Sequence, residues 1–285
     1  MATATSSSHT VQINGLSCRY LQWGEADSPP LLLLHGLRSY ARTWEHVAQA
    51  LSGSHLLIAP DFRGRGESGW DPQRSYRTGT YVSDVESLVA MLGLKRFAIV
   101  GHSMGGTVAY TYTARHPDQV TALVIEDIGP GSSTETSGAA RILSEMADTP
   151  PCFSSLEEVR TYWRGIRPDI TEEALASRIE NTVRPMDDGR YAWRLDMTGI
   201  AEARRTPDPA GAVDLWSCVE ALRCPTLVMR GARSDFLPVG ICEQMAQRQP
   251  LLRWEQVPDA GHYVHDDNPA VFIDLVRAFF AAQRS

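Results

Sequence analysis

The segment GHSMG at residues 101–105 places a hydroxyl between two glycines. In the pattern G-x-S-x-G, the serine stands on a strained turn between a strand and a helix, and its small neighbours let backbone segments approach closely. Such a serine is exposed above a sheet and can attack a carbonyl carbon. The following helix N-terminus offers backbone N–H groups to an oxyanion. The segment therefore predicts Ser103 as a nucleophile, provided that a strand precedes it and a helix follows.

A serine hydroxyl needs a base within hydrogen-bond reach. Among the eight histidines, His262 follows the turn 258–261, which ends the last predicted strand. Parallel strands share a carboxyl edge, so His262 should arrive at the same edge as Ser103. His265 is the nearest alternative but lies closer to the final helix. We expect the side chain of His102 to point away from the nucleophile and to pack.

A third group must orient the imidazole and stabilise its protonated form. Two carboxylates follow predicted strands: Asp235 in the segment RGARSD after residues 225–229, and Asp127 in the segment EDIGP after residues 120–125. Both loops lie at the carboxyl edge of the predicted sheet. The residues alone leave both assignments open.

These side chains are positioned by a regular series of strands and helices. Short, continuously apolar runs are typical of strands that are covered on both faces. They alternate with helical patterns, which predicts a mostly parallel sheet with helices on both sides. We predict such strands at residues 30–34, 55–59, 97–100, 120–125, 225–229 and 253–257. Before them, Asn14-Gly15 predicts a tight hairpin turn between two further strands.

The alternation stops after Gly129-Pro130-Gly131. Residues 131–212 contain helical patterns that are divided by proline and glycine, with no convincing buried strand. We therefore predict a helical cap at 131–212, inserted into a core formed by residues 1–130 and 213–285. Four aromatic residues of the cap are interpreted as its core, with a role in lining a substrate pocket as the alternative: Tyr162, Trp163, Tyr191 and Trp193.

Taken together, the motifs resemble those of the α/β-hydrolase fold family over nearly the whole chain. The matching pieces are His35-Gly36, the segment DFRGRGES at 61–68, GHSMGG at 101–106, GARSD at 231–235 and Gly261-His262. The resemblance implies an α/β fold with a mostly parallel eight-stranded sheet, helices on both faces and an inserted helical cap. In that family the acid most often follows the strand after the cap, which favours Asp235. Some members place it one strand earlier, at the position of Asp127.

The resemblance also implies an oxyanion hole and an activity. The backbone N–H of Met104 follows the nucleophile directly, and the resemblance places the second donor at Leu37. The implied reaction is hydrolysis of a small-molecule carboxylic ester through an acyl-enzyme. Carbon–carbon bond cleavage and lactone hydrolysis use the same residues, and some relatives are receptors without catalysis, so these functions remain alternatives. A serine at position 103 disfavours dehalogenase and epoxide hydrolase activities, which use aspartate there.

Composition excludes several other classes of function. The net charge of −7 argues against nucleic-acid or anionic-membrane surfaces. Five scattered cysteines lack the spacing of a disulfide framework or zinc site, and no leader segment is recognised, so we expect a cytoplasmic protein without a metal. The segment GRGESG at 64–69 matches a dinucleotide fingerprint, but no helix is predicted after it, so no cofactor is expected. The oligomeric state stays open, a homo-oligomer included.

Overall fold

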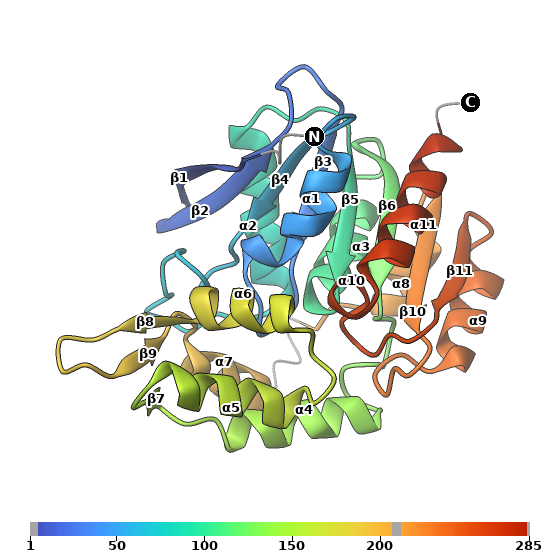
Figure 1. The fold of residues 1–285 in the computed structure, drawn as a ribbon. Helices are drawn as coiled ribbons and strands as arrows, with labels where there is room; N and C mark the ends of the chain where they lie inside the picture. Colours follow the sequence, from blue (N-terminus) through green and yellow to red (C-terminus); the bar gives the residue numbers. More distant parts are fainter. Residues whose placement is uncertain (1–4, 207–211, 284–285) are drawn as a thin grey trace.

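The computed structural model describes residues 5–206 and 212–283, with an eight-stranded sheet at its centre (Figure 1). The strand order is β1-β2-β4-β3-β5-β6-β10-β11. The β1–β2 and β2–β4 pairs are antiparallel, and the remaining neighbours are parallel. This confirms the predicted fold class. The strands are β1 (Ser7–Ile13), β2 (Leu16–Trp23), β3 (Pro30–Leu34), β4 (Leu56–Pro60), β5 (Phe97–His102), β6 (Val120–Glu126), β10 (Thr226–Gly231) and β11 (Leu252–Val257).

The predicted hairpin connects the first two strands. Asn14 and Gly15 have φ angles of 48° and 79°, so both central residues adopt the left-handed conformation. That conformation matches the twist of the flanking strands, and it is why Asn-Gly favours a two-residue hairpin. Ile13 accordingly pairs with Leu16.

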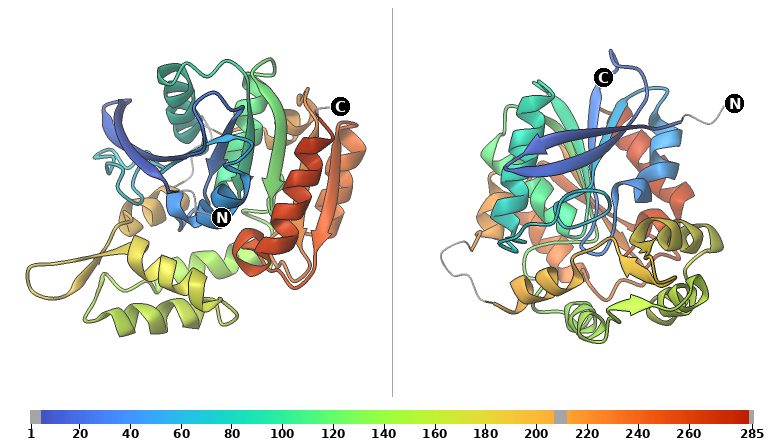
Figure 2. Two further views of the ribbon diagram at one scale, coloured as in Figure 1. Left: turned by 45° about the horizontal axis from the view of Figure 1, so that its top comes forward. Right: turned by 90° about the vertical axis from the view of Figure 1, so that its left-hand side faces the viewer.

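Helices cover both faces of the sheet (Figure 2). Apolar residues of α2, α3, α8 and α9 belong to the core on one face, and those of α1 and α11 to the core on the other. Successive strand residues point to opposite faces, so both cores need continuously apolar strands. In β5, for example, Ile99 belongs to one core and Val100 to the other. These helices are α1 (Glu45–Leu51), α2 (Thr78–Met91), α3 (Met104–Arg115), α8 (Leu215–Glu220), α9 (Val239–Arg248) and α11 (Pro269–Ala281).

The segment between β6 and α8 folds as four helices across one end of the sheet (Figure 1). Each of these helices begins after a Ser, Thr or Asp whose side chain accepts a hydrogen bond from the first turn. We use the word cap for residues 131–212, as predicted from the sequence. The helices are α4 (Ser137–Ala147), α5 (Leu156–Ile166), α6 (Glu172–Thr182) and α7 (Met197–Arg205).

The cap also contains strands, which the sequence analysis did not expect. A small antiparallel sheet has the order β7-β9-β8, formed by β7 (Cys152–Phe153), β8 (Val183–Pro185) and β9 (Tyr191–Trp193). Strands of two or three residues are too short for a period-two alternation to be recognised. The helical cap predicted from the sequence thus also carries three short strands.

The aromatic residues of the cap form its core, as interpreted from the sequence. Trp163 and Trp193 are buried in a cluster with Phe153, and the rings of Tyr162 and Tyr191 pack against it.

The cap is joined to core loops by ion pairs from Arg141 to Asp235 and from Arg167 and Arg178 to Asp266. The short helix α10 (Val264–Asp267) carries Asp266.

Within the residues that the structure describes, no helix combines the length and apolar character needed to span a membrane.

The separate core of the cap leads to a prediction about local stability. Leu175 is fully buried in this cluster, and its replacement by alanine should destabilise the cap by about 2–5 kcal/mol through the cavity that it leaves. Leu156→Ala is the matched control, because Leu156 is 44% exposed. In Leu175→Ala, hydrogen exchange should accelerate in cap amides more than in β5 and β6. Equal acceleration in both parts would contradict an independently opening cap.

Candidate active site

Ser103 occupies the turn between β5 and α3, as its motif predicts. β5 ends at His102 and α3 begins at Met104. Ser103 itself has φ 51° and ψ −119°, a conformation that non-glycine residues rarely adopt. Its backbone N–H donates to the carbonyl oxygen of Glu126 over 2.9 Å, which ties the turn to the end of β6.

The glycines of this segment allow the helix to pack directly on the sheet. A Cβ atom added at Gly105 would lie 2.2 Å from the carbonyl oxygen of Leu34. One added at Gly101 would lie 2.5 Å from the carbonyl oxygen of Gly105. Any larger residue would therefore push α3 away from the strands and displace Ser103.

His262 connects Ser103 to a carboxylate. Its Nε2 lies 2.9 Å from Ser103 Oγ, and its Nδ1 lies 2.8 Å from Asp127 Oδ2. Both hydrogen bonds form in one tautomer of His262, in which Nδ1–H donates to the carboxylate and Nε2 accepts from the hydroxyl. Burial lowers the pKa of His262, so the imidazole is neutral at neutral pH. The neutral imidazole is the form that can accept a proton from serine.

Asp127 is held in place by the loop that follows β10. Its Oδ1 accepts the Gly231 N–H over 3.0 Å, and its Oδ2 accepts the Ser234 hydroxyl over 2.5 Å. Asp127 is fully buried, and burial raises the pKa of its carboxyl. The hydrogen bonds from Ser234 and Gly231 lower the pKa of Asp127, because they stabilise the charged carboxylate. Sequence reasoning did not single out Ser234, since nothing in its spacing distinguishes it from any other loop serine.

Asp235, the acid favoured by the family pattern, does not contact His262. Its carboxylate instead accepts two hydrogen bonds from Arg141 of α4, from Nε over 2.8 Å and from Nη2 over 3.0 Å. The hydrogen bond from Arg141 also lowers the pKa of Asp235. The geometry thus corrects the preference for Asp235: the loop turns Ser234 inward to Asp127 and Asp235 outward to the cap.

Two other histidines lie beside the site but do not contact Ser103 through hydrogen bonds. His102 was expected to point away and pack; its ring is buried, but Nε2 donates to the carbonyl oxygen of His262 over 2.9 Å. His265 bonds Glu126 through Nδ1 at 2.7 Å and Thr43 through Nε2 at 3.0 Å. His102 therefore helps to fix the backbone of His262, and His265 forms a separate buried pair.

The loop after β3 also lies close to Ser103. A Cβ atom added at Gly36 would lie 3.5 Å from Ser103 Cβ. His35 holds this loop, since its Nδ1 donates to the Gly36 carbonyl oxygen over 2.8 Å and its Nε2 accepts the Phe62 N–H over 3.1 Å. Burial lowers the pKa of His35 to about 3, as this neutral pattern requires. His35 is thus a structural residue, as the sequence analysis expected.

Arg65 joins the two residues that were predicted to form the oxyanion hole. Its Nε donates to the carbonyl oxygen of Leu37 over 2.9 Å, and its Nη2 lies 3.5 Å from Met104 Sδ. The side chain is fully buried. Sequence reasoning quoted Arg65 within DFRGRGES but found no role for it, because its contacts come from two distant segments.

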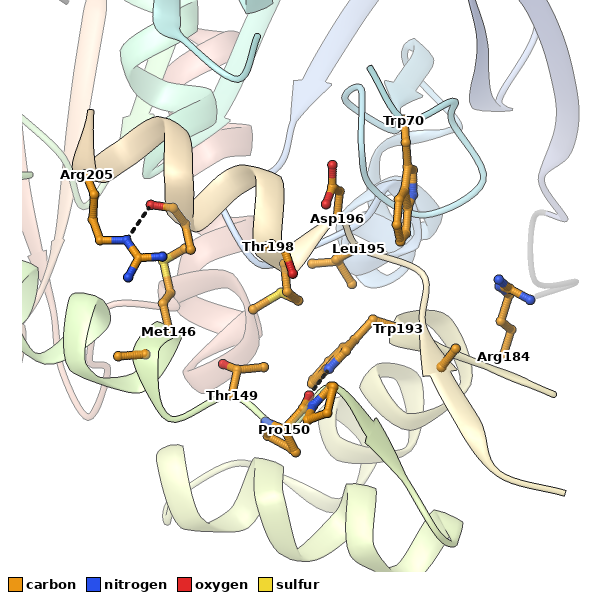
Figure 3. A pocket seen from close by; sticks show the side chains of 15 residues that line it. Trp70, Met146, Thr149, Pro150, Arg184, Trp193, Leu195, Asp196, Thr198 and Arg205 are labelled. Atoms are coloured by element: carbon orange, nitrogen blue, oxygen red, sulfur yellow. Dashed lines mark hydrogen bonds between the residues drawn. The ribbon is translucent and has the colours of Figure 1, made fainter. Parts of the chain in front are cut away.

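Three cavities lie near the cap. The cavity in Figure 3, about 460 Å³, is lined by Trp70 and cap residues including Trp193, and none of Ser103, Asp127 or His262 lines it. A cavity of about 320 Å³ is lined by His262. A third, of about 290 Å³, is lined by Leu37 and Met104. The second cavity therefore adjoins the hydrogen-bonded site, and the third adjoins the two residues predicted to form the oxyanion hole. Among the described residues, no cluster of three or more His, Cys, Asp or Glu side chains could hold a metal ion.

Comparison with known proteins agrees with this architecture. Residues 31–275 match the model of the alpha/beta hydrolase family. The chain belongs to this family. It is 31% identical to a 3-hydroxybutyrate-oligomer hydrolase from Cupriavidus necator, over 85% of this chain and 86% of that protein. It is 29% identical to an sn-1-specific diacylglycerol lipase from Mus musculus, over 90% of this chain and 83% of that protein.

A solved structure extends the likeness to three dimensions. The crystal structure of E-2-(acetamidomethylene)succinate hydrolase matches with a TM-score of 0.84 at 25% identity, covering 97% of this chain and 100% of that one. The sequence-based identification of an α/β-hydrolase family member is thereby confirmed. The family relationship covers both the core and the segment between β6 and α8.

The close packing of α3 gives a test of the turn geometry. Gly105→Ala should lower the free energy of unfolding by about 1–3 kcal/mol or more, because the new methyl group meets the Leu34 backbone. Gly240→Ala in α9 is the matched control, since an added Cβ there meets no atom within 4 Å. Urea unfolding measures both. Equal stability of the two variants would contradict the packing described here.

Proposed function

We propose that this protein hydrolyses carboxylic esters through an acyl-enzyme, with Ser103 as nucleophile, His262 as general base and Asp127 as the acid of the triad. The observation that carries the proposal is the unbroken chain of hydrogen bonds from Ser103 Oγ through the imidazole to the Asp127 carboxylate. This is the arrangement in which a neutral imidazole can remove the serine proton as the hydroxyl attacks.

The reaction then proceeds in two halves. Ser103 Oγ forms a bond to the carbonyl carbon while its proton moves to His262 Nε2, and the carbonyl oxygen becomes an oxyanion. The backbone N–H groups of Leu37 and Met104 stabilise this charge. His262 next gives its proton to the departing alcohol as the carbon–oxygen bond breaks. Water then attacks the acyl-enzyme while His262 accepts its proton and passes it to Ser103 Oγ, and the carboxylic acid product is released.

Asp127 acts through the imidazole. Its carboxylate holds the Nδ1–H tautomer, so that Nε2 faces Ser103, and it stabilises the imidazolium that forms in each half-reaction. Ser234 and Gly231 keep the carboxylate fixed during these steps. Strain at Ser103 and rigid support of Asp127 both serve to hold the reacting groups in one geometry.

Two of the relatives support ester substrates among the chemistries that such a triad allows. They are, by their names, a hydrolase of 3-hydroxybutyrate oligomers and a diacylglycerol lipase. We therefore propose a small-molecule ester as the substrate, in preference to a lactone or a carbon–carbon bond, and an enzyme rather than a receptor.

The role of the nucleophile is tested with 4-nitrophenyl butyrate. Ser103→Ala should lower kcat by about a factor of 10⁶. Only the residual activity that the oxyanion donors supply should remain. Ser144→Ala, at one of the exposed serines of α4, is the control and should retain activity. Mass spectrometry should find a small phosphonate attached to Ser103. Saturable ester binding without any turnover by the unmodified protein would favour the receptor alternative.

The acid is tested by two isosteric replacements. Asp127→Asn should lower kcat by about 10⁴, because the amide favours the wrong imidazole tautomer. Asparagine tolerates the positive φ of 50° at this position, so the backbone should be retained. Asp235→Asn should have a far smaller effect, since it weakens a partly exposed ion pair with Arg141. The reverse ranking of kcat values would restore Asp235 as the acid.

A further inference from the structure

The cavity of about 290 Å³ beside Leu37 and Met104 is here named the acyl cavity. Its position follows from the proposed mechanism. His262 must protonate the leaving group, so the alcohol portion of a substrate lies on the side of His262, where the cavity of about 320 Å³ is found. The acyl portion then extends past the oxyanion donors on the other side. It enters the cavity that Leu37 and Met104 line.

Arg65, a buried cation with neutral partners, contacts Leu37 and Met104, which line the acyl cavity. The guanidinium of Arg65 donates to the carbonyl oxygens of Leu37 and Arg63 over 2.9 and 2.8 Å, and it lies over the ring of Tyr81 at 5.0 Å from the centroid. Among the described residues, no carboxylate forms an ion pair with Arg65. Burying an unpaired charge is costly, so a fully buried guanidinium without a counter-charge is unusual.

Two guanidinium groups line the cavity itself, those of Arg77 and Arg204. Arg77 donates to the Thr206 carbonyl oxygen over 3.1 Å. Among the described residues, Arg204, in the last turn of α7, hydrogen bonds the Ser133 carbonyl oxygen over 3.5 Å from Nη2. Its Nε atom is buried and has no hydrogen-bond partner. Burial, and then the charge of Arg65, lower the pKa of Arg204. Within the described part of the chain, no Asp or Glu lines the cavity.

Tyr81 adds an unused neutral donor. Its side chain lines the acyl cavity, its exposed fraction is 2%, and its O–H finds no acceptor among the described residues. The Arg65 guanidinium lies near enough to donate to the hydroxyl oxygen. A buried donor without a partner costs free energy of about 1–3 kcal/mol, and native structures contain few of them. Two donors without acceptors, from α2 and α7, thus face a cavity whose described lining contains arginines and no carboxylate. A carboxylate oxygen is the acceptor that would satisfy both.

We propose that the acyl cavity binds a carboxylate at the far end of the acyl group, through Arg204 and the hydroxyl of Tyr81, with Arg65 adding its positive charge. The substrates are then monoesters of dicarboxylic acids. This inference rests on the proposed ester hydrolysis and narrows it to one substrate class.

Two esters of equal chain length test the inference: mono-4-nitrophenyl adipate and 4-nitrophenyl hexanoate, which differ in a terminal carboxylate against a methyl group. The ratio of their kcat/KM values, corrected for spontaneous hydrolysis, should favour the adipate ester by at least about tenfold in the unmodified protein. Arg204→Met keeps the apolar stem and should lower this ratio by at least about tenfold. Tyr81→Phe removes only the hydroxyl and should lower it several-fold.

The neighbouring arginine provides the control. Arg205 is exposed, bonds the Ala201 carbonyl oxygen and lies outside the acyl cavity, so Arg205→Met should keep the ratio unchanged. Unfolding temperatures check that each variant is folded. A ratio near one in the unmodified protein, or the same ratio in Arg204→Met, would overturn the carboxylate site while leaving ester hydrolysis intact.

Failure of the proposed function gives a different result. If neither ester is hydrolysed in a manner that depends on Ser103, ester hydrolysis is overturned. The carboxylate site is then decided by calorimetric titration of Ser103→Ala with adipate. Binding that disappears in the Ser103→Ala, Arg204→Met double variant supports the site, and absence of binding to Ser103→Ala overturns it.

Discussion

The hydrogen bond between His262 Nδ1 and Asp127 Oδ2 joins loops that follow β11 and β6, which are separated in the sheet by β10. β10 ends between them at Gly231, where a Cβ atom would lie only 2.0 Å from the Gly261 carbonyl oxygen. Asp127 accepts hydrogen bonds from the Gly231 N–H and from Ser234 in the loop that follows. The ends of three neighbouring strands thus meet in one network, and the geometry of Ser103 and His262 depends on all three.

Two consecutive carboxylates at the end of β6 each hold a histidine. Asp127 bonds His262, and Glu126 bonds His265, whose pKa is raised by the nearby carboxylates despite burial. The Glu126 carbonyl oxygen also accepts the Ser103 N–H. Buried charges need partners, and removing one member of a buried pair leaves the other unpaired in a low-dielectric interior. The second pair therefore supports the end of β6, where Ser103 and Asp127 are both attached.

Sequence reasoning located Ser103 and His262 because their motifs depend on local geometry: a strand, a turn and small neighbours. It favoured Asp235 on the family pattern, because the residues alone do not separate Asp127 from Asp235: both follow parallel strands and end at one edge. The choice depends on where Ser234 and Arg141 point, which are contacts between segments about 100 residues apart. For the same reason, sequence reasoning assigned no role to Arg65 or Tyr81, because their roles depend on the residues that surround them. The strands of the cap were missed because they are too short for a pattern to be recognised.

The ion pair between Arg141 and Asp235 has a mechanical consequence. Asp235 is adjacent in sequence to Ser234, which donates to Asp127. Helix α4 is therefore connected to the Asp127 carboxylate through one bidentate ion pair, one peptide linkage and one hydrogen bond. A displacement of α4 would be transmitted along this short path to the carboxylate that bonds His262.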